Sequence, residues 1–188
     1  MFRERGFADT GMRDIAEAAD LSAANLYHYF RGKDEILFYC QDRALDRMLA
    51  SVRRTRTARS TGTDRLRLVL SAHVQTMLDD VEGASAHVQL ESLPPALRAT
   101  IVRKRDRYER ALRRLLDEGV ARGEFIAMDS AIVTRAMLGA LNWTVTWFDP
   151  AGSKSAAEVA DLIAGFLVRG VVLRSPVPPR AMKLVTRR

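Results

Sequence analysis

The chain has 188 residues, of which 47% are hydrophobic and 28% are charged, and its formal net charge is +7. This content is enough to bury a core in one compact unit or in a small domain fused to a larger one, which excludes disorder throughout the chain. No run approaches the roughly 18 to 20 apolar residues of a membrane span, and the charged start is unlike a signal peptide. We therefore expect a cytoplasmic protein without a membrane partner.

The basic balance is compatible with a nucleic-acid partner, because lysine and arginine neutralise phosphates and release counterions. Residues 1–60 are nearly balanced in charge, so DNA binding by this part would depend on specific side chains. The single cysteine, Cys40, can form no internal disulfide, and it shows no zinc-ligand spacing with the three histidines. We interpret Cys40 as a helix-packing residue, and we expect neither a metal nor a cofactor.

Apolar residues recur at helical spacing along almost the whole chain, and no run alternates as a half-buried strand does. The sequence therefore predicts an all-α fold, divided by glycines and prolines. The expected helices cover residues 11–19, 22–29, 33–55, 64–81, 84–91, 95–122, 129–148 and 155–174. We expect three parts: a small helical domain over 1–45, a larger helical domain over 46–174, and a disordered basic tail over 175–188.

Residues 6–37, GFADTGMRDIAEAADLSAANLYHYFRGKDEIL, predict two short helices around a tight turn. Thr10 is suited to begin the first helix as its N-cap, and Ser22 is suited to begin the second. Leu26 and Phe30, spaced i and i+4, are expected to point inward. Two short helices around a tight turn form a helix-turn-helix.

The segments RGF, MRDIAEAA, LSAANLYHYF and GKDEIL together resemble, in order and spacing, the DNA-binding domain of the TetR family. The resemblance implies a homodimer that binds double-stranded operator DNA through its DNA-binding domain over 1–45. It also implies that the domain over 46–174 serves ligand binding and dimerisation. Within the DNA-binding domain, Asn25 is suited to read adenine, Tyr27 and Lys33 to contact the DNA backbone, and Arg13 to contact a guanine or a phosphate. The alternatives are a solvated helix face for Arg13, core packing for Tyr27 and a supporting role for His28. The expected DNA contacts are Thr10, Arg13, Ser22, Ala23, Ala24, Asn25, Tyr27, His28, Tyr29 and Lys33.

The sequence departs from the family pattern in two places. Relatives carry a whole amphipathic helix before the RGF element, whereas Met1 stands at the last turn of that helix. Ala23 and Ala24 occupy positions where a basic residue or glycine is common, so we expect few contacts with DNA bases at these positions. The alternative function is a ligand-binding and dimerisation module that has lost DNA binding, and in-frame coding sequence upstream of Met1 would distinguish the two.

The last two expected helices are apolar over wide faces, so neither is expected to stay exposed. Two such helices fit a symmetric four-helix interface of the kind that TetR-type dimers form, with packing inside one chain as the alternative. The expected interface residues are Leu141, Trp147, Phe148, Leu162 and Phe166.

The stretch NWTVTWFDPAG, which follows ARGEF at residues 121–125, resembles the branch of the family that senses acyl-CoA thioesters. Trp143 is expected either to form a wall of the effector pocket or to serve as a core or interface anchor. The expected effector contacts are Met77, His87, Leu90, Tyr108, Leu112 and Trp143. The basic run over 103–114 is interpreted as a solvated helix face, with contact to effector phosphates as a guess.

Enzymatic activity is not expected, because the sequence contains no G-x-S-x-G, H-E-x-x-H, P-loop or G-x-G-x-x-G motif. The resemblance to the TetR family implies a ligand-responsive DNA-binding regulator, a repressor released by a small hydrophobic effector such as an acyl-CoA.

Overall fold

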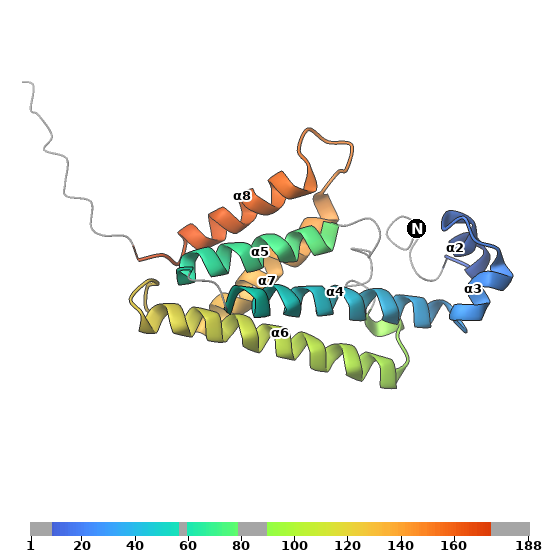
Figure 1. The fold of residues 1–188 in the computed structure, drawn as a ribbon, viewed down its shortest axis with the longest axis horizontal. Coiled ribbons are helices and arrows are strands. Elements are labelled where there is room, and N and C mark those ends of the chain that lie inside the picture. Colours follow the sequence, from blue (N-terminus) through green and yellow to red (C-terminus); the bar gives the residue numbers. More distant parts are fainter. Residues whose placement is uncertain (1–8, 57–59, 79–89, 174–188) are drawn as a thin grey trace, which may run out of the picture.

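The computed structural model describes residues 9–56, 60–78 and 90–173, and it confirms the all-α fold (Figure 1). In chain order the elements are α2 (Met12–Ala18), α3 (Ala23–Tyr29), α4 (Lys33–Arg56), α5 (Gly62–Leu78), the 3-10 turn η2 (Leu90–Ser92), α6 (Pro95–Ala121), α7 (Ser130–Trp147) and α8 (Ala156–Arg169). Among the described residues, no helix is long and apolar enough to cross a membrane.

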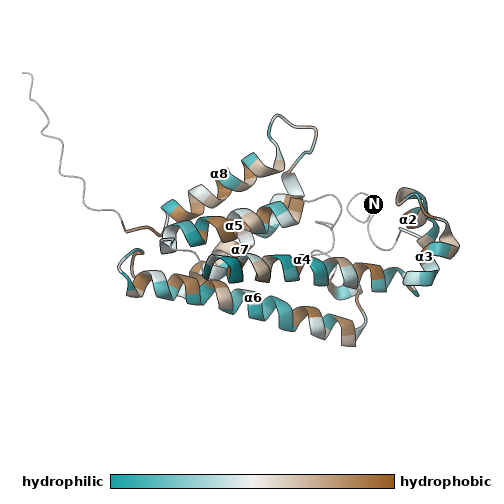
Figure 2. Ribbon diagram, in the orientation of Figure 1, coloured by the Kyte–Doolittle hydropathy of each residue, from teal (hydrophilic) through white to brown (hydrophobic). Residues whose placement is uncertain are grey.

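Helix α4 connects two parts of the molecule (Figure 1). Helices α2 and α3 form a small unit at its first turns, and the rest of α4 runs along α6. Helix α5 packs on α4, α8 lies beside α5 on the side away from α6, and α7 packs on both α5 and α6. Apolar residues recur along α5, α7 and α8, whereas α6 carries a long hydrophilic face (Figure 2).

Short polar side chains fix the starts of the last two helices. The carboxylate of Asp129 accepts hydrogen bonds from the backbone N–H groups of Ala131 and Ile132, at 2.9 and 3.1 Å. At α8, Ser155 and Glu158 form a capping box, in which each side chain accepts from the other residue's backbone N–H. Both starts lie within one residue of the expected positions.

Two expected helices differ in the structure. The helix expected over 84–91 falls mostly outside the described residues, and Leu90–Ser92 form a 3-10 turn. Helix α8 ends at Arg169 instead of continuing to residue 174, because the chain turns at Gly170 and pairs with the segment after α6. There the N–H of Ile126 donates to the carbonyl of Val171 at 2.9 Å. The tail predicted over 175–188 lies outside the described residues.

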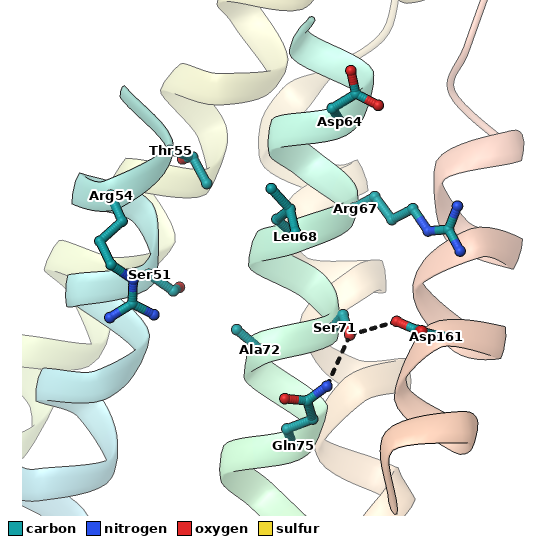
Figure 3. A pocket seen from close by; sticks show the side chains of 10 residues that line it. All are labelled: Ser51, Arg54, Thr55, Asp64, Arg67, Leu68, Ser71, Ala72, Gln75 and Asp161. Carbon is teal, nitrogen blue, oxygen red and sulfur yellow. Dashed lines mark hydrogen bonds between the residues drawn. The ribbon is translucent and has the colours of Figure 1, made fainter. Parts of the chain in front are cut away.

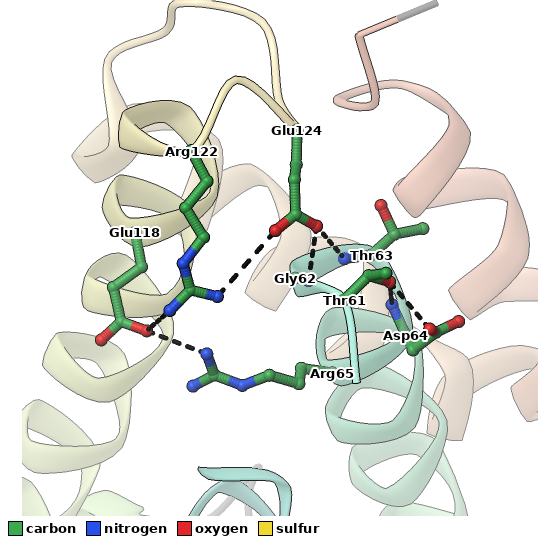
Figure 4. Close-up of polar contacts among 8 residues, drawn as sticks. All are labelled: Thr61, Gly62, Thr63, Asp64, Arg65, Glu118, Arg122 and Glu124. Atoms are coloured by element: carbon green, nitrogen blue, oxygen red, sulfur yellow. Dashed lines mark hydrogen bonds and ion pairs between the residues drawn. The ribbon is translucent and has the colours of Figure 1, made fainter. Parts of the chain in front are cut away.

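A polar junction joins the start of α5 to the end of α6 (Figure 4). The carboxylate of Glu124 accepts from the backbone N–H of Gly62 at 2.5 Å and of Thr63 at 3.3 Å, and so caps α5. Arg65, whose side chain is mostly buried, pairs with Glu118 at 2.9 Å. This junction explains why α5 begins at Gly62, two residues before the expected start.

The buried apolar side chains form two clusters that meet on α4. The smaller cluster contains Ala16, Leu26 and Ile36, and the main one begins at Leu37 and extends through α8. Cys40 is partly buried and packs against both clusters, which confirms its role in packing. The first turns of α4 therefore connect the small helical unit to the main core.

Candidate DNA-contacting and effector sites

The small unit at the start of α4 has the geometry of a helix-turn-helix. Helices α2 and α3 pack on each other, and the turn between them places Asp20 at φ 54°, a left-handed conformation that aspartate tolerates better than most residues. The hydroxyl of Ser22 accepts from the backbone N–H of Asn25 at 3.1 Å, so Ser22 is the N-cap of α3 as predicted. Leu26 is buried and Phe30 is half-buried in the small cluster, as expected.

Most of the predicted DNA-contacting side chains lie on the outside of this unit. Those exposed are Arg13, Ser22, Ala24, Asn25, Tyr27, His28 and Tyr29. Ala23 is half-buried against the small cluster. Lys33 is the first residue of α4 and is half-buried, next to a tight link in which the N–H of Arg31 donates to Glu35 at 2.8 Å.

The structure corrects the role expected for Thr10. The N-cap of α2 is Gly11, whose N–H donates to the carboxylate of Asp14 at 2.8 Å. Thr10 itself is fully buried, so its side chain is not placed to meet a phosphate.

A cavity of about 260 Å³ lies between α4, α5, α6 and α7. Its apolar walls come from Leu45 and Met48 on α4 and from Leu138 on α7. The polar side chains that line it are His73, Arg105, Tyr108, Glu109 and Asn142. A mostly apolar hollow with a few convergent polar groups is typical of a small-molecule site.

A chain of hydrogen bonds crosses this cavity. Nδ1 of His73 lies 3.1 Å from the hydroxyl of Tyr108, and its Nε2 lies 3.1 Å from Oδ1 of Asn142. Burial lowers the pKa of His73 to about 4, although the bond to Asn142 acts in the opposite direction, and the ring is neutral at pH 7. Because Oδ1 can only accept, Nε2 carries the proton and Tyr108 donates to Nδ1. The amide nitrogen of Asn142 is then left to donate to a ligand.

One arginine of the basic run on α6 reaches the cavity. Arg105 is half-buried and lines it, and burial lowers the pKa of its guanidinium. Glu109, one turn further along α6, supplies a carboxylate to the same wall. Arg103, Arg107 and Arg110 are exposed, as expected of a solvated face.

Several predicted effector contacts lie elsewhere. Trp143 is 64% exposed and is not part of the wall of this cavity, and its exposure agrees with the alternative interpretation, an interface anchor. Met77 and Leu112 are fully buried in the main core, where side-chain packing holds them away from the cavity. Leu90 packs at the edge of that core, and His87 lies outside the described residues.

Of the predicted contacts that fall within the described residues, Tyr108 alone lines the cavity. Sequence reasoning missed His73 and Asn142, and the signal that was available is a polar residue on an otherwise apolar helix face. In α5, His73 follows Val69 and Leu70 at helical spacing, and all three are buried.

A second hollow, of about 600 Å³, is an open groove on the outer side of α4 and α5 (Figure 3). Three of its polar side chains are linked: Ser71 donates to Asp161 at 2.8 Å, and Gln75 donates to Ser71 at 3.3 Å. On α5 this groove lies on the opposite face from His73, so it is separate from the cavity.

Helices α7 and α8 present a continuous exposed apolar face. Its large side chains are Ile132, Trp143, Trp147, Leu162 and Phe166. A surface hollow of about 550 Å³ lies on this face between the two helices, beside Phe166. Exposed apolar faces of this kind mark interaction surfaces.

The structure divides the predicted interface residues. Trp147, Leu162 and Phe166 are exposed on the apolar face, as an interface requires. Leu141 and Phe148 are buried in the core of the same chain, because they point toward the other helices, so the prediction that they lie at the dimer interface was wrong.

Comparisons with known proteins agree with this architecture. Residues 1–40 match the family model described as bacterial regulatory proteins, tetR family, and residues 59–171 match the tetracyclin repressor-like C-terminal domain. The chain is 25% identical to the HTH-type transcriptional repressor KstR2 of Mycobacterium tuberculosis over 178 residues, which cover 91% of this chain and 87% of the relative.

Two solved structures are also similar. The TetR family transcriptional regulator PfmR from Thermus thermophilus superimposes with a TM-score of 0.78 and 34% identity, over 89% of this chain and 92% of that chain. AibR, solved in complex with isovaleryl coenzyme A and operator DNA, has a TM-score of 0.70 and 23% identity, over 89% of this chain and 91% of that chain. Matches that together span the helix-turn-helix and the helical domain show that the chain belongs to the TetR family of bacterial regulatory proteins, which are transcription regulators and not enzymes.

Proposed function

We propose that this protein is a homodimeric repressor that binds operator DNA through α3 and is released when a hydrophobic acyl compound enters the cavity between α4 and α7. One observation carries the proposal: α4 is a continuous helix whose first residue, Lys33, belongs to the DNA-contacting unit and whose Leu45 and Met48 line the cavity. Anything that moves the cavity wall therefore acts on the element that holds the helix-turn-helix.

The exposed side chains of the small unit divide into readers and positioners of DNA. The amide of Asn25, on the exposed face of α3, suits the bidentate pair of groups on adenine. Tyr27, Tyr29 and the ammonium of Lys33 suit the phosphate backbone, and Arg13 suits either a guanine or a phosphate. Because Ala23 and Ala24 offer no hydrogen-bonding side chain, base reading depends mainly on Asn25 and Arg13.

Two copies are needed to read a symmetric operator, and the exposed apolar face of α7 and α8 supplies the contact. Pairing this face with its copy across a two-fold axis would form a four-helix interface and cover Trp143, Trp147 and Phe166. The hollow beside Phe166 offers space for a side chain of the partner.

The size and lining of the cavity limit the effector. A volume of about 260 Å³ lies below the range of about 300 to 1,000 Å³ that is usual for drug-sized ligands, so it suits a short acyl group and not a whole coenzyme A. AibR, similar in fold, has isovaleryl coenzyme A and operator DNA in its solved complex, and KstR2 is named a repressor. We therefore place the acyl group inside the cavity and any coenzyme A portion outside it.

Release of DNA requires that the effector favour a protein geometry in which the two α3 helices no longer match successive major grooves. A ligand with equal affinity for both geometries would change nothing. A typical coupling of about 1 to 3 kcal/mol would lower operator affinity roughly 5- to 150-fold.

The test is a gel shift with DNA flanking the gene for this protein, with and without short acyl-CoAs. We expect a retarded protein–DNA complex that dissociates when isovaleryl-CoA or a homologue is added. Lys33→Ala should weaken binding to specific and random DNA alike, whereas Asn25→Ala should relax preference at one position per half-site, by about 1 to 3 kcal/mol. Wild-type complexes that no acyl-CoA affects would reject the effector class, and equal effects of both variants on all DNA would reject the division of roles.

A further inference from the structure

Gln41 is the described side chain whose burial is hardest to explain within the protein alone. It lies in α4 with no exposed surface, and neither its amide nitrogen nor its amide oxygen has a hydrogen-bond partner. Buried amides are nearly always paired in folded proteins, so an unpaired one needs a specific explanation. An apolar residue of the same length would fill this position without leaving a polar group unsatisfied.

Its place on α4 relates Gln41 to the cavity. Leu45 and Met48, which line the cavity, follow Gln41 at i+4 and i+7 and therefore share its helix face. From α6, Lys104 pairs with Asp42 at 2.5 Å. Asp42 is the chain neighbour of Gln41, and Lys104 is the chain neighbour of Arg105. Gln41 and Arg105 therefore lie at the same level of the contact between α4 and α6. Gln41 does not itself line the cavity: it lies one helical turn beyond the wall, on the side toward the helix-turn-helix, so a ligand that contacts it must extend past Leu45.

The polar groups around the cavity favour one kind of ligand atom. The amide nitrogen of Asn142 and the guanidinium of Arg105 are hydrogen-bond donors, while the carboxylate of Glu109 pairs with Arg135 at 3.6 Å. The amide of Gln41 is neutral, so it suits a neutral acceptor such as the carbonyl oxygen of an acyl thioester. A free carboxylate would cost more free energy to bury beside a neutral amide.

We propose that Gln41 is the specificity-determining residue for the effector, and that its amide nitrogen donates to the carbonyl oxygen of a short acyl thioester bound in the cavity. This inference rests on the proposed function. The buried amide has no partner in the ligand-free protein and becomes paired when the thioester binds. The site therefore has a higher affinity for a ligand whose carbonyl reaches Gln41.

The position of Gln41 also explains how ligand binding would alter the helix-turn-helix that contacts the DNA. Cys40, its neighbour, packs against both apolar clusters, and Lys33 begins α4 eight residues earlier, about 12 Å along the helix axis. A new bond at Gln41 therefore acts on the segment of α4 that joins the two clusters.

The experiment compares wild type with Gln41→Met, which keeps the length of the side chain and removes the amide. Gln75→Met is the matched control, because Gln75 is an exposed glutamine on α5 that bonds to Ser71 in the outer groove. Isovaleryl-CoA and isovalerate serve as probes, and binding is measured by calorimetry and by thermal shift. In the absence of a probe, Gln41→Met should melt no lower than wild type. We expect the wild type and Gln75→Met to bind isovaleryl-CoA with equal affinity and to prefer it to isovalerate, and Gln41→Met to bind it about 10-fold or more weakly.

Each contrary result has its own meaning. If Gln41→Met and the shorter Gln41→Leu both melt well below wild type, the amide is paired within the protein and the inference is overturned. If Gln41→Met binds isovaleryl-CoA as tightly as wild type, the inference is overturned while the proposed function stands. If wild type binds neither this thioester nor its straight-chain homologues, the proposed effector class fails and the role of Gln41 fails with it.

Discussion

Phe166→Ala is the sharpest perturbation of the proposed dimer. Phe166 is 69% exposed in the single chain, and removing its ring takes about 100 Å² of apolar surface from the interface. At about 25 cal/mol per Å² this is ~2.5 kcal/mol per ring, and the two-fold axis doubles it to ~5 kcal/mol per dimer. The dimer dissociation constant should then rise by between about 10³- and 10⁴-fold.

The assay is sedimentation velocity over a dilution series, which measures the fraction of dimer at each protein concentration. Val102→Ala is the control, because Val102 is an exposed apolar residue on α6, away from the α7 and α8 face. Replacing both Leu162 and Phe166 with charged residues should yield monomers at all practical concentrations. A Phe166→Ala protein that dimerises like wild type would show that the contact lies on another surface.

Three further predictions concern the folded chain. Gly119→Ala should lower the free energy of unfolding by about 1 to 3 kcal/mol in urea titrations, because the added Cβ would lie 2.1 Å from the ring of Phe125. Gly139→Ala is the control and should not lower it, because the added Cβ would have nothing within 4 Å. Equal effects of the two variants would contradict the packing argument. The pKa of His73 is about 4 in the folded protein, below its ordinary value of 6.5. Stability should therefore fall as the pH falls from about 6.5 to 4, because the unfolded chain takes up a proton that the folded one does not. The loss should approach about 3 kcal/mol and shrink in His73→Gln, and an unchanged pH profile of unfolding in that variant would refute the assignment. Glu124→Ala should destabilise the protein by about 1 to 2 kcal/mol, because it removes the acceptor of the Gly62 and Thr63 N–H groups while Thr61 still caps Asp64. A melting temperature equal to that of wild type would show that water replaces the carboxylate without loss.

The helix boundaries followed from the sequence where local chemistry decides them. Ser22, Asp129 and Ser155 accept hydrogen bonds from the N–H groups of the next turn, and such caps are visible in the sequence. Helix α8 ends early for a reason that no local pattern contains, since pairing of its exit with the segment after α6 depends on the tertiary fold.

Burial was predictable for the helix-turn-helix and less so for the helical domain. Leu26 and Phe30 point inward as their i, i+4 spacing indicates, because this spacing places both on the same side of α3. In α7 nearly every face is apolar, so periodicity did not distinguish Leu141, which is buried, from Trp143, which is exposed. For the same reason the cavity, which depends on where four helices separate, was beyond sequence reasoning.

The central claim is that the operator and the acyl effector compete through the two geometries of one protein. The most direct measurement is the thermodynamic cycle: the affinity of the wild type for its operator with and without saturating isovaleryl-CoA, and its affinity for isovaleryl-CoA with and without saturating operator. Because binding free energies are linked, the two ratios must be equal, and the account predicts a common factor of roughly 5 to 150 in the direction of weaker binding. Operator affinity that is the same with and without the thioester, measured where the thioester is shown to be bound, would contradict it.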